Sequence, residues 1–531
     1  MNYYKIAFLR IPLIFLLMSS IIFSQSNTRI SGFITDKESG EVLVGANVFL
    51  METGKGMATD RNGYYVLDNI IPGDYTFIIS YLGYEEYKEK INFVEDLIIK
   101  KDIELPRIVL QSEEVVVQGE RIQRKINIQP SKVSLSPRQI KNYPALAEPD
   151  IFRAIQALPG VLTSSEFSTG LIIRGGNTDQ NLILLDGITV YNPSHLGGLF
   201  SNFILDAVKD AELIKGGYNA EYGGRLSAVL NVTSREGNRK EFQGTANISL
   251  LAAQTTLEGP FYKGAWVLSM RRTYIDQALK LASDLNLTDA KVPYYFYDLQ
   301  GHMFSDISPK DRLSISFYGG LDDFYFDDLG FNAEWGNRTF SLAYRRLFND
   351  LLIGNFLIAN SKFETFFGLG GESGIRDNNL IDDQTFAANF SYFQSQDLTW
   401  KFGVQGKILG FDYTSSFSDT VLFRIDRSPY ELAAYLKTKV PLGDSFIIEP
   451  GIRFNTYSDQ KNNFFPELRL GLKYLINDDR YINFAVGNYH QFIQTAQDDF
   501  NPSIIDFWIA IDKSVKAGAS QQIVLGYEEY I

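Results

Sequence analysis

The side chains that could carry out chemistry are few and scattered in this sequence. Its three histidines, His195, His302 and His490, lie far apart and form no pair of metal ligands, and the absence of cysteine excludes disulfides and thiolate metal sites. The sequence has no G-x-S-x-G elbow, no H-E-x-x-H motif and no phosphate-binding loop. We therefore expect no catalytic residue, no bound metal and no cofactor. We expect each histidine to be an ordinary polar or interfacial side chain.

Two acidic runs, Asp322–Asp328 and Asp377–Asp383, contain the residue type that binds calcium. Neither has the ligand spacing of an EF-hand loop. Carboxylates in solvated loops are the commoner origin of such runs. We therefore expect external loops here and no metal site.

The overall composition narrows the class of partner. The net charge of −13 argues against a nucleic acid, which requires a basic face on the protein. A chain of 531 residues should hold several domains. With 30 tyrosines and 40 phenylalanines, its aromatic content suits a protein that has two interfaces lined by aromatic side chains.

The most informative segment is 171–235. Two short apolar runs, Leu182–Leu185 and Ile188–Tyr191, flank Asp186-Gly187, a dipeptide that favours a type I′ hairpin. Glycine pairs recur along the segment, where the backbone can take a positive φ or pass close to a neighbour. The pairs are Gly175-Gly176, Gly216-Gly217 and Gly223-Gly224. These features predict a small, turn-rich mixed α/β domain over residues 133–238.

Two short helices are expected in this domain. Glu148–Leu158 has Pro149 near its start, and the helix breaker Pro159-Gly160 follows it. Phe203–Leu213 is predicted to be either a short helix or a transition from helix to strand.

Residues 1–25 are typical of a secretory signal peptide. Lys5 and Arg10 precede an apolar run from 11 to 23, and Ser24–Ser26 follow as the expected cleavage region. No later segment approaches the roughly 20 apolar residues that a membrane helix needs. If the protein crosses a bilayer, it must do so as a closed β-barrel.

Residues 28–112 alternate apolar and polar side chains in short runs separated by turn signals. Several short strands at this spacing predict a small immunoglobulin- or transthyretin-like β-sandwich. The unit resembles the carboxypeptidase regulatory-like domain, which is non-catalytic, and it has no zinc-binding His/Glu pair. The resemblance is carried by Gly45–Val48, Thr59–Tyr65 and Pro72–Tyr75.

Residues 113–132 follow as a docking segment and charged linker. Glu114, Val115, Val116 and Val117 could form an exposed strand that adds to the sheet edge of a partner. The alternative, given equal weight, is that these residues are the last strand of the sandwich or plain linker.

From residue 239 onward the sequence changes to long alternating segments, such as Leu313–Tyr318 and Ile447–Phe454. Alternation over roughly ten residues is typical of a transmembrane β-strand, with one face toward lipid and the other toward the lumen. Short turns alternate with longer polar stretches, two of which are Asp322–Glu334 and Gly368–Gln384. Outer-membrane barrels have this arrangement, with short connections on one side and long ones on the other.

The chain as a whole resembles the TonB-dependent outer-membrane receptors, in the variant of Bacteroidetes-type bacteria that carries an extra N-terminal domain. The resemblance rests on the order of signal peptide, sandwich, valine-rich segment, glycine-rich plug and barrel. The plug residues that carry it are Arg174, Gly175, Gly176, Asp186, Gly187, Gly216, Gly217, Tyr222, Gly223, Gly224 and Arg225. It implies a mainly β protein without enzymatic activity in the outer membrane of a Gram-negative bacterium, with the sandwich and docking segment in the periplasm.

The resemblance also implies partners and roles. Residues 114–117 would be the TonB box, which pairs with TonB, itself energised from the inner membrane. The barrel would contact outer-membrane lipid and import a small extracellular solute such as an iron chelate. Arg174 and Arg225 would lie where the plug meets the barrel and pair with lumen carboxylates.

One departure from the family concerns the size of the barrel. Residues 239–531 contain about 13 or 14 strand-like segments, depending on whether Glu241–Pro260 is one strand or a hairpin. A plug of this size needs the wide lumen of a barrel of about 22 strands. We therefore expect an incomplete transmembrane β-barrel and a C-terminally truncated receptor.

Three other functions remain open from the sequence. The protein could be an outer-membrane binding or signalling receptor without transport, or a non-functional fragment of a split receptor. It could also be a secreted, soluble adhesin or enzyme domain. The ligand is not encoded in any motif; the plug sequence differs from that of the polysaccharide-importing branch, which favours a chelate or another small solute.

Overall fold

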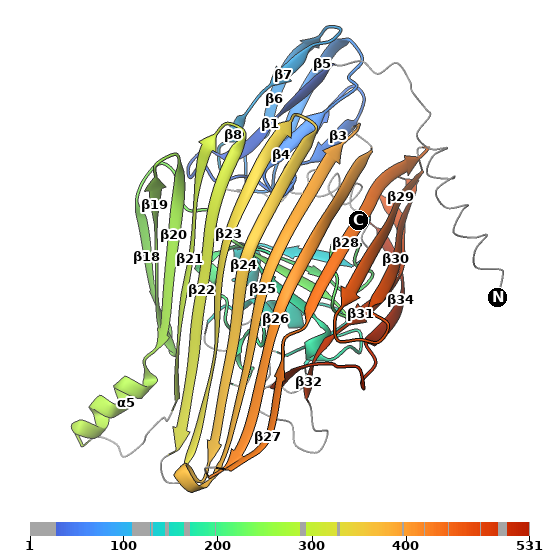
Figure 1. Ribbon diagram of the computed structural model, residues 1–531. Helices are drawn as coiled ribbons and strands as arrows, with labels where there is room; N and C mark the ends of the chain where they lie inside the picture. Colours follow the sequence, from blue (N-terminus) through green and yellow to red (C-terminus); the bar gives the residue numbers. More distant parts are fainter. Residues whose placement is uncertain are drawn as a thin grey trace, which may run out of the picture.

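The computed structural model shows a small β-sandwich, a mixed domain and one large curved sheet (Figure 1). The residues it describes are 28–108, 128, 131–143, 148–163, 170–196, 198–286, 294–326, 330–395, 398–418, 420–443, 445–477, 479–496 and 507–529. The expected signal peptide and the segment 114–117 lie outside these residues.

The N-terminal unit is a β-sandwich of two sheets. One sheet contains β4-β1-β7 with β8 also on β1, and the other has the order β3-β2-β5-β6. Alternating apolar residues from both sheets, among them Ile30, Val48 and Phe77, form its core. The strands are β1 (Arg29–Asp36), β2 (Asn47–Leu50), β3 (Lys55–Ala58), β4 (Tyr64–Leu67), β5 (Gly73–Ser80), β6 (Tyr87–Phe93), β7 (Ile98–Lys100) and β8 (Ile103–Leu105).

The second unit, here called the plug, is built on a five-stranded sheet with the order β13-β12-β17-β16-β9. Its strands are β9 (Lys132–Leu135), β12 (Leu182–Leu185), β13 (Ile188–Thr189), β16 (Val208–Ile214) and β17 (Val229–Ser234). Smaller elements complete it: α3 (Pro137–Ile140), α4 (Ile151–Gln156), β10 (Val161–Thr163), β11 (Leu171–Ile173), η3 (Thr178–Gln180), β14 (Ser194–His195), β15 (Phe200–Ser201) and η4 (Leu205–Ala207).

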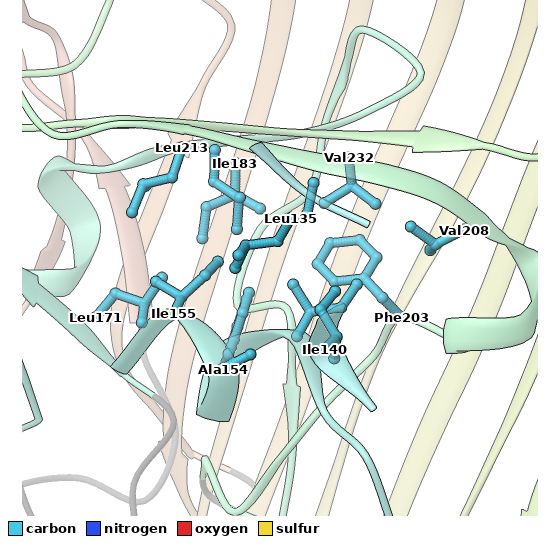
Figure 2. Close-up of a cluster of buried hydrophobic side chains, with 14 of the residues drawn as sticks. Leu135, Ile140, Ala154, Ile155, Leu171, Ile183, Phe203, Val208, Leu213 and Val232 are labelled. Atoms are coloured by element: carbon cyan, nitrogen blue, oxygen red, sulfur yellow. The ribbon is translucent and has the colours of Figure 1, made fainter. Parts of the chain in front are cut away.

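The core of the plug lies between this sheet and the short helices (Figure 2). Ile140 and Ile155 of the helices pack against Leu213 and Val232 of the sheet. Asp150 caps α4 by accepting a hydrogen bond from the backbone N–H of Arg153. The predicted helix at 148–158 is therefore present but shorter. The segment 203–213 is the predicted transition, a single 3-10 turn followed by β16.

The third unit, here called the wall, is an antiparallel sheet of 15 strands in the part of the chain that the structure describes. Strands that follow one another in the sequence pair with each other, with one exception. β26 pairs with both β27 and β28, and β27 lies off the main order of the sheet. Its members are β18 (Gln243–Ile248), β19 (Ala252–Phe261), β20 (Gly264–Thr273), β21 (Tyr294–Ser308), β22 (Asp311–Phe326), β23 (Phe331–Asn349), β24 (Leu352–Leu369), β25 (Ile375–Phe393), β26 (Thr399–Phe417), β27 (Thr420–Arg427), β28 (Tyr430–Leu442), β29 (Phe446–Tyr457), β30 (Phe464–Asn477), β31 (Arg480–Gln491) and β34 (Gly518–Glu529).

The connections of the wall carry little additional structure. A helix, α5 (Ile275–Asp284), follows β20, a turn η6 (Gly371–Ser373) follows β24, and the small hairpin β32 (Ile493–Ala496) and β33 (Phe507–Ala510) follows β31. Among the described residues, no helix combines the length and the apolar character that crossing a membrane requires.

The two faces of the wall differ in polarity. Ile358 and Phe386 pair across β24 and β25 and are 55% and 45% exposed. Their neighbours Ala359 and Thr385 pair in the next register position and are buried on the inner face. Apolar residues outside and small or polar residues inside are the pattern of a lipid-facing wall.

The wall is open in the described residues, because its order starts at β18 and ends at β34 without a pairing between them. The region 241–260 is a hairpin of β18 and β19. The wall thus has 15 strands among the described residues, one or two more than the 13 or 14 expected, and 241–260 forms two strands rather than one.

The expected long loops were wrong in two places. Residues 322–334 and 368–384 belong mostly to β22 to β25, and β23 and β25 each have 19 residues. Only about 10 residues are needed to cross the hydrocarbon layer. The ends of these strands carry polar side chains on both faces, such as Asp322 and Asp323, so the sequence there does not show the apolar alternation.

Candidate functional site

The plug lies against the inner face of the wall, and this interface is the candidate functional site. Plug residues contact wall strands from β19 to β34. The residues predicted from the glycine-rich segment fall at turns of the plug, and most of those turns meet the wall.

Asp186-Gly187 forms the predicted hairpin between β12 and β13. Both residues have a positive φ, 51° and 84°, as a type I′ turn requires. The Asp186 carboxylate accepts a hydrogen bond of 2.8 Å from the backbone N–H of Ser234. The turn is thereby fixed to the end of β17, beside Leu357 of the wall.

The two glycines of the pair Gly223-Gly224 are required for different reasons. A Cβ at Gly223 would lie 2.3 Å from Nε of Arg453 on β29, so this position allows a close approach of plug and wall. Gly224 has φ 79°, which L-residues disfavour, and a Cβ there would meet only Glu431, at an ordinary contact distance of 3.9 Å.

Wall arginines hold the carbonyl groups of the same turn. The Arg469 guanidinium donates to the Tyr222 carbonyl at 2.5 Å, and that of Arg453 donates to the Glu221 carbonyl at 3.3 Å. Farther along, Gln522 of β34 accepts a hydrogen bond of 2.7 Å from the Gly217 N–H.

The glycine pair Gly175-Gly176 packs within the plug instead, where a Cβ at Gly176 would meet Ser227 at 2.6 Å. Arg174 is exposed, has φ 51° and donates to the Ser131 hydroxyl. Arg225 is buried, with its guanidinium 5.3 Å from the Trp508 ring centre. Neither forms an ion pair with a carboxylate among the described residues, unlike the expected pairing.

His195 is fully buried between plug and wall. Its Nδ1 lies 2.7 Å from Asp322 of β22, and its Nε2 lies 2.9 Å from Asp298 of β21. The ring stacks on Phe296 at a centroid distance of 4.0 Å. Burial lowers the pKa of His195, but the charges of Asp298 and Asp322 outweigh it and raise the pKa to about 9. The ring is therefore a cation at neutral pH.

Arg271 of β20 extends this buried network. Its guanidinium donates to Asp298 at 2.8 Å, to Glu148 of the plug at 2.7 Å and to the Ser201 carbonyl at 2.8 Å. Tyr318 donates to Asp298 at 2.6 Å. Two cations and several neutral donors thus satisfy carboxylates that burial would otherwise destabilise.

A second network lies on the neighbouring strands. Lys407 of β26 donates to Asp383 of β25 at 2.7 Å and to the Thr189 hydroxyl of the plug at 3.0 Å. Tyr191 of the plug also donates to Asp383, at 2.9 Å. The expectation of solvated loop carboxylates is wrong for Asp322 and Asp383, which lie within strands and are each 1% exposed.

A third network joins all three units at Glu221. Its carboxylate lies 3.6 Å from Arg61 of the sandwich, 3.6 Å from Lys401 and 3.4 Å from Lys437 of the wall. Burial raises the pKa of Glu221, but these three cations lower it well below its usual range. Glu221 is therefore ionised and paired with three cations.

Reasoning from the sequence missed the members of these networks. The sequence did offer one signal for them, a charged residue at an inward position of an alternating strand. Asp298, between Tyr297 and Leu299, is an example. In a lipid-facing strand, such a residue must find a partner in the lumen.

A curved antiparallel wall with an apolar outer face and a mixed plug against its inner face is the arrangement of a plugged outer-membrane barrel. Residues 30–117 match the family described as CarboxypepD_reg-like domain, and residues 125–229 match the TonB-dependent Receptor Plug Domain. Over these two domains the chain is similar to the TonB-dependent receptors.

Two curated relatives illustrate the match. The TonB-dependent transporter Oar of Myxococcus xanthus is 28% identical over 46% of this chain and 23% of its own length. The TonB-dependent receptor SusC of Bacteroides thetaiotaomicron is 24% identical over 63% of this chain and 32% of its own length. The matched region thus spans about a quarter to a third of these relatives.

Solved structures share the fold at low identity. The ferric enterobactin receptor of Pseudomonas aeruginosa superposes with a TM-score of 0.58 and 14% identity, covering 77% of this chain and 70% of that one. The siderophore receptor PirA of Acinetobacter baumannii gives a TM-score of 0.58 and 14% identity, over 77% and 69%.

Proposed function

We propose that this protein binds a scarce extracellular solute and moves it to the periplasm with energy that TonB transmits to the plug. The observation that carries the proposal is a set of buried ion pairs and hydrogen bonds across the plug–wall interface, which lie beside apolar contacts such as those of Tyr191 and Phe200 with the wall. His195, Lys407 and Glu221 anchor the plug through ion pairs and hydrogen bonds. Water can replace the polar contacts when the plug shifts, so a shift costs less than it would if the whole interface were apolar.

The route of force follows from the topology. The chain enters the plug at β9, an edge strand whose four residues pair with β16. A pull on residues 114–117 would therefore load β9 before any other strand of the plug sheet. An outer membrane has neither ATP nor an ion gradient of its own, so mechanical work from the inner membrane is the available energy source.

The solute that we propose is small, such as an iron chelate, because the plug sequence differs from that of the polysaccharide-importing branch. An oligosaccharide is the second candidate, because the resemblance to TonB-dependent receptors implies an architecture that also admits such solutes. Cells that depend on this receptor should grow on one class of solute and not the other. Growth on ferric chelates supports the first, and growth on oligosaccharides with no effect of iron supports the second.

The test of TonB coupling is a deletion of residues 114–117. Binding of the solute to whole cells should persist while its uptake is lost. A deletion of residues 121–124 shortens the linker equally and should retain uptake. Undiminished uptake without residues 114–117 would exclude the TonB-box assignment and leave a binding or signalling receptor as the better function.

The same residues have a second assignment, because the match to the regulatory-like domain extends to residue 117. If they form the last strand of the sandwich, their deletion should make the sandwich susceptible to protease. If they are the TonB box, the sandwich should stay as resistant as in the control deletion.

A further inference from the structure

Strand β4 of the sandwich is buried on both faces, although a sandwich strand ordinarily has one face in water. Tyr65 and Leu67 point into the core of the sandwich. Tyr64 and Val66 point the other way and are each 1% exposed. The outer face of this strand is therefore covered by another part of the molecule.

The cover is the end of the wall, at a patch here called the wall contact. Tyr64 and Val66 pack against Leu347, Ile353 and Phe393, which lie at the ends of β23, β24 and β25. In Figure 1 the sandwich sits directly over the ends of these strands.

Polar bonds surround the wall contact. The Tyr64 hydroxyl donates to the Asp350 carbonyl at 2.8 Å, in the turn between β23 and β24. The Asp350 carboxylate lies 3.1 Å from Lys100 and 3.6 Å from Arg29, both of the sandwich. A buried aromatic side chain within a ring of polar bonds is the arrangement of a specific interface.

A second patch, here called the plug contact, joins the sandwich to the plug. Arg61 donates to the Tyr222 hydroxyl and lies 3.8 Å from Glu212 of β16 and 3.6 Å from Glu221. Lys209 of β16 donates to the Val42 carbonyl at 2.5 Å. The sandwich thus contacts the turn of the plug that wall arginines also hold.

We propose that the sandwich is a latch on the periplasmic face of the plug, which must lift from the wall contact and the plug contact before the plug can move. This inference rests on the proposed transport function. The plug cannot shift away from the wall toward the periplasm while Arg61 and Lys209 join it to a sandwich that is itself fixed on the ends of β23 to β25.

The order of the chain makes the latch responsive to force. The segment 113–132 lies between the sandwich and β9, so a pull on it loads the two latch contacts on one side and β9 on the other. Most of the ion pairs of the latch are partly exposed and individually weak. The wall contact around Tyr64 is therefore the part that sets how firmly the latch holds.

The experiment uses the absence of cysteine from the chain. The pair Lys100→Cys with Asp350→Cys is bridged in cells by a bifunctional methanethiosulfonate reagent, which dithiothreitol removes. The control pair, Glu89→Cys with Lys101→Cys, replaces an ion pair of 2.7 Å within the sandwich. Bridging should abolish uptake in the first pair and leave it unchanged in the control, with surface binding intact in both and uptake restored by the reductant.

Uptake by the bridged first pair at the unbridged rate would overturn the latch. If the unbridged protein imports nothing, the proposed transport function fails instead. The contact between sandwich and wall is then tested by the yield of the bridging reaction between Cys residues at positions 100 and 350. In that measurement Tyr64→Ala should lower the yield by about tenfold, because a buried aromatic anchor dominates such an interface. An unchanged yield would show that the sandwich is not held there.

Discussion

The buried histidine between plug and wall gives a prediction about pH. Raising the pH from 6 to 10 should weaken the hold of the wall on the plug, because His195 loses the proton that makes it a partner for Asp298 and Asp322. Its pKa of about 9 in the protein lies above the ordinary value of 6.5. The stabilisation is therefore fully present below pH 6.5 and is lost as the pH rises through about 9.

The size of the effect follows from these two values. Each unit of difference between the two pKa values corresponds to about 1.4 kcal/mol, so neutralising His195 should lower the stability of the plug by about 3 kcal/mol. The opening free energy of β12 and β17 can be measured by hydrogen exchange, corrected for the intrinsic rate at each pH. Exchange in these strands should become about a hundredfold faster across this range.

The matched variant is His195→Gln, which should show little change over the same range. Because the chain has three histidines, NMR of carbon-13-labelled histidine can follow the titration directly, and the signal absent from the variant belongs to His195. An equal loss of protection in the variant, or a titration of His195 below pH 7, would refute the reasoning.

Two further predictions concern the plug. Gly223→Ala should lower the stability of the plug by about 1–3 kcal/mol, because the added methyl group would displace the buried Arg453 side chain. Gly224→Ala should cost about 1 kcal/mol, through the backbone conformation alone. Equal melting temperatures of the two variants would contradict this. Asp150→Ala should cost about 1–3 kcal/mol in thermal unfolding, since it removes the cap of α4 and leaves the buried N–H of Ser201 without its acceptor; an unchanged unfolding temperature would argue against that role.

The features predicted correctly are those that short stretches of sequence determine. The Asp186-Gly187 hairpin was predictable because its conformation depends on those two residues. The lipid-facing strands were predictable because alternation is a property of each strand alone, as between Ile358 and Ala359. Counting such strands gave 13 or 14, close to the 15 strands of the wall.

The features missed depend on residues far apart in the chain. His195 finds its carboxylates 103 and 127 residues later, and no local pattern links them. The strands at 322–334 and 368–384 were mistaken for loops because polar side chains stand on both faces once the strand leaves the lipid. Only the pairing with neighbouring strands shows that they are extended.

The parallel pair of β12 and β17 has a consequence for biogenesis. Leu182 of the first strand pairs with Val229 of the second, so the central ladder of the plug needs residues that emerge late in its own synthesis. β17 is also the last plug strand before β18, the first strand of the wall. The central part of the plug sheet can therefore form only when the first hairpin of the wall is about to follow. Until then, periplasmic chaperones would meet a plug whose sheet is incomplete.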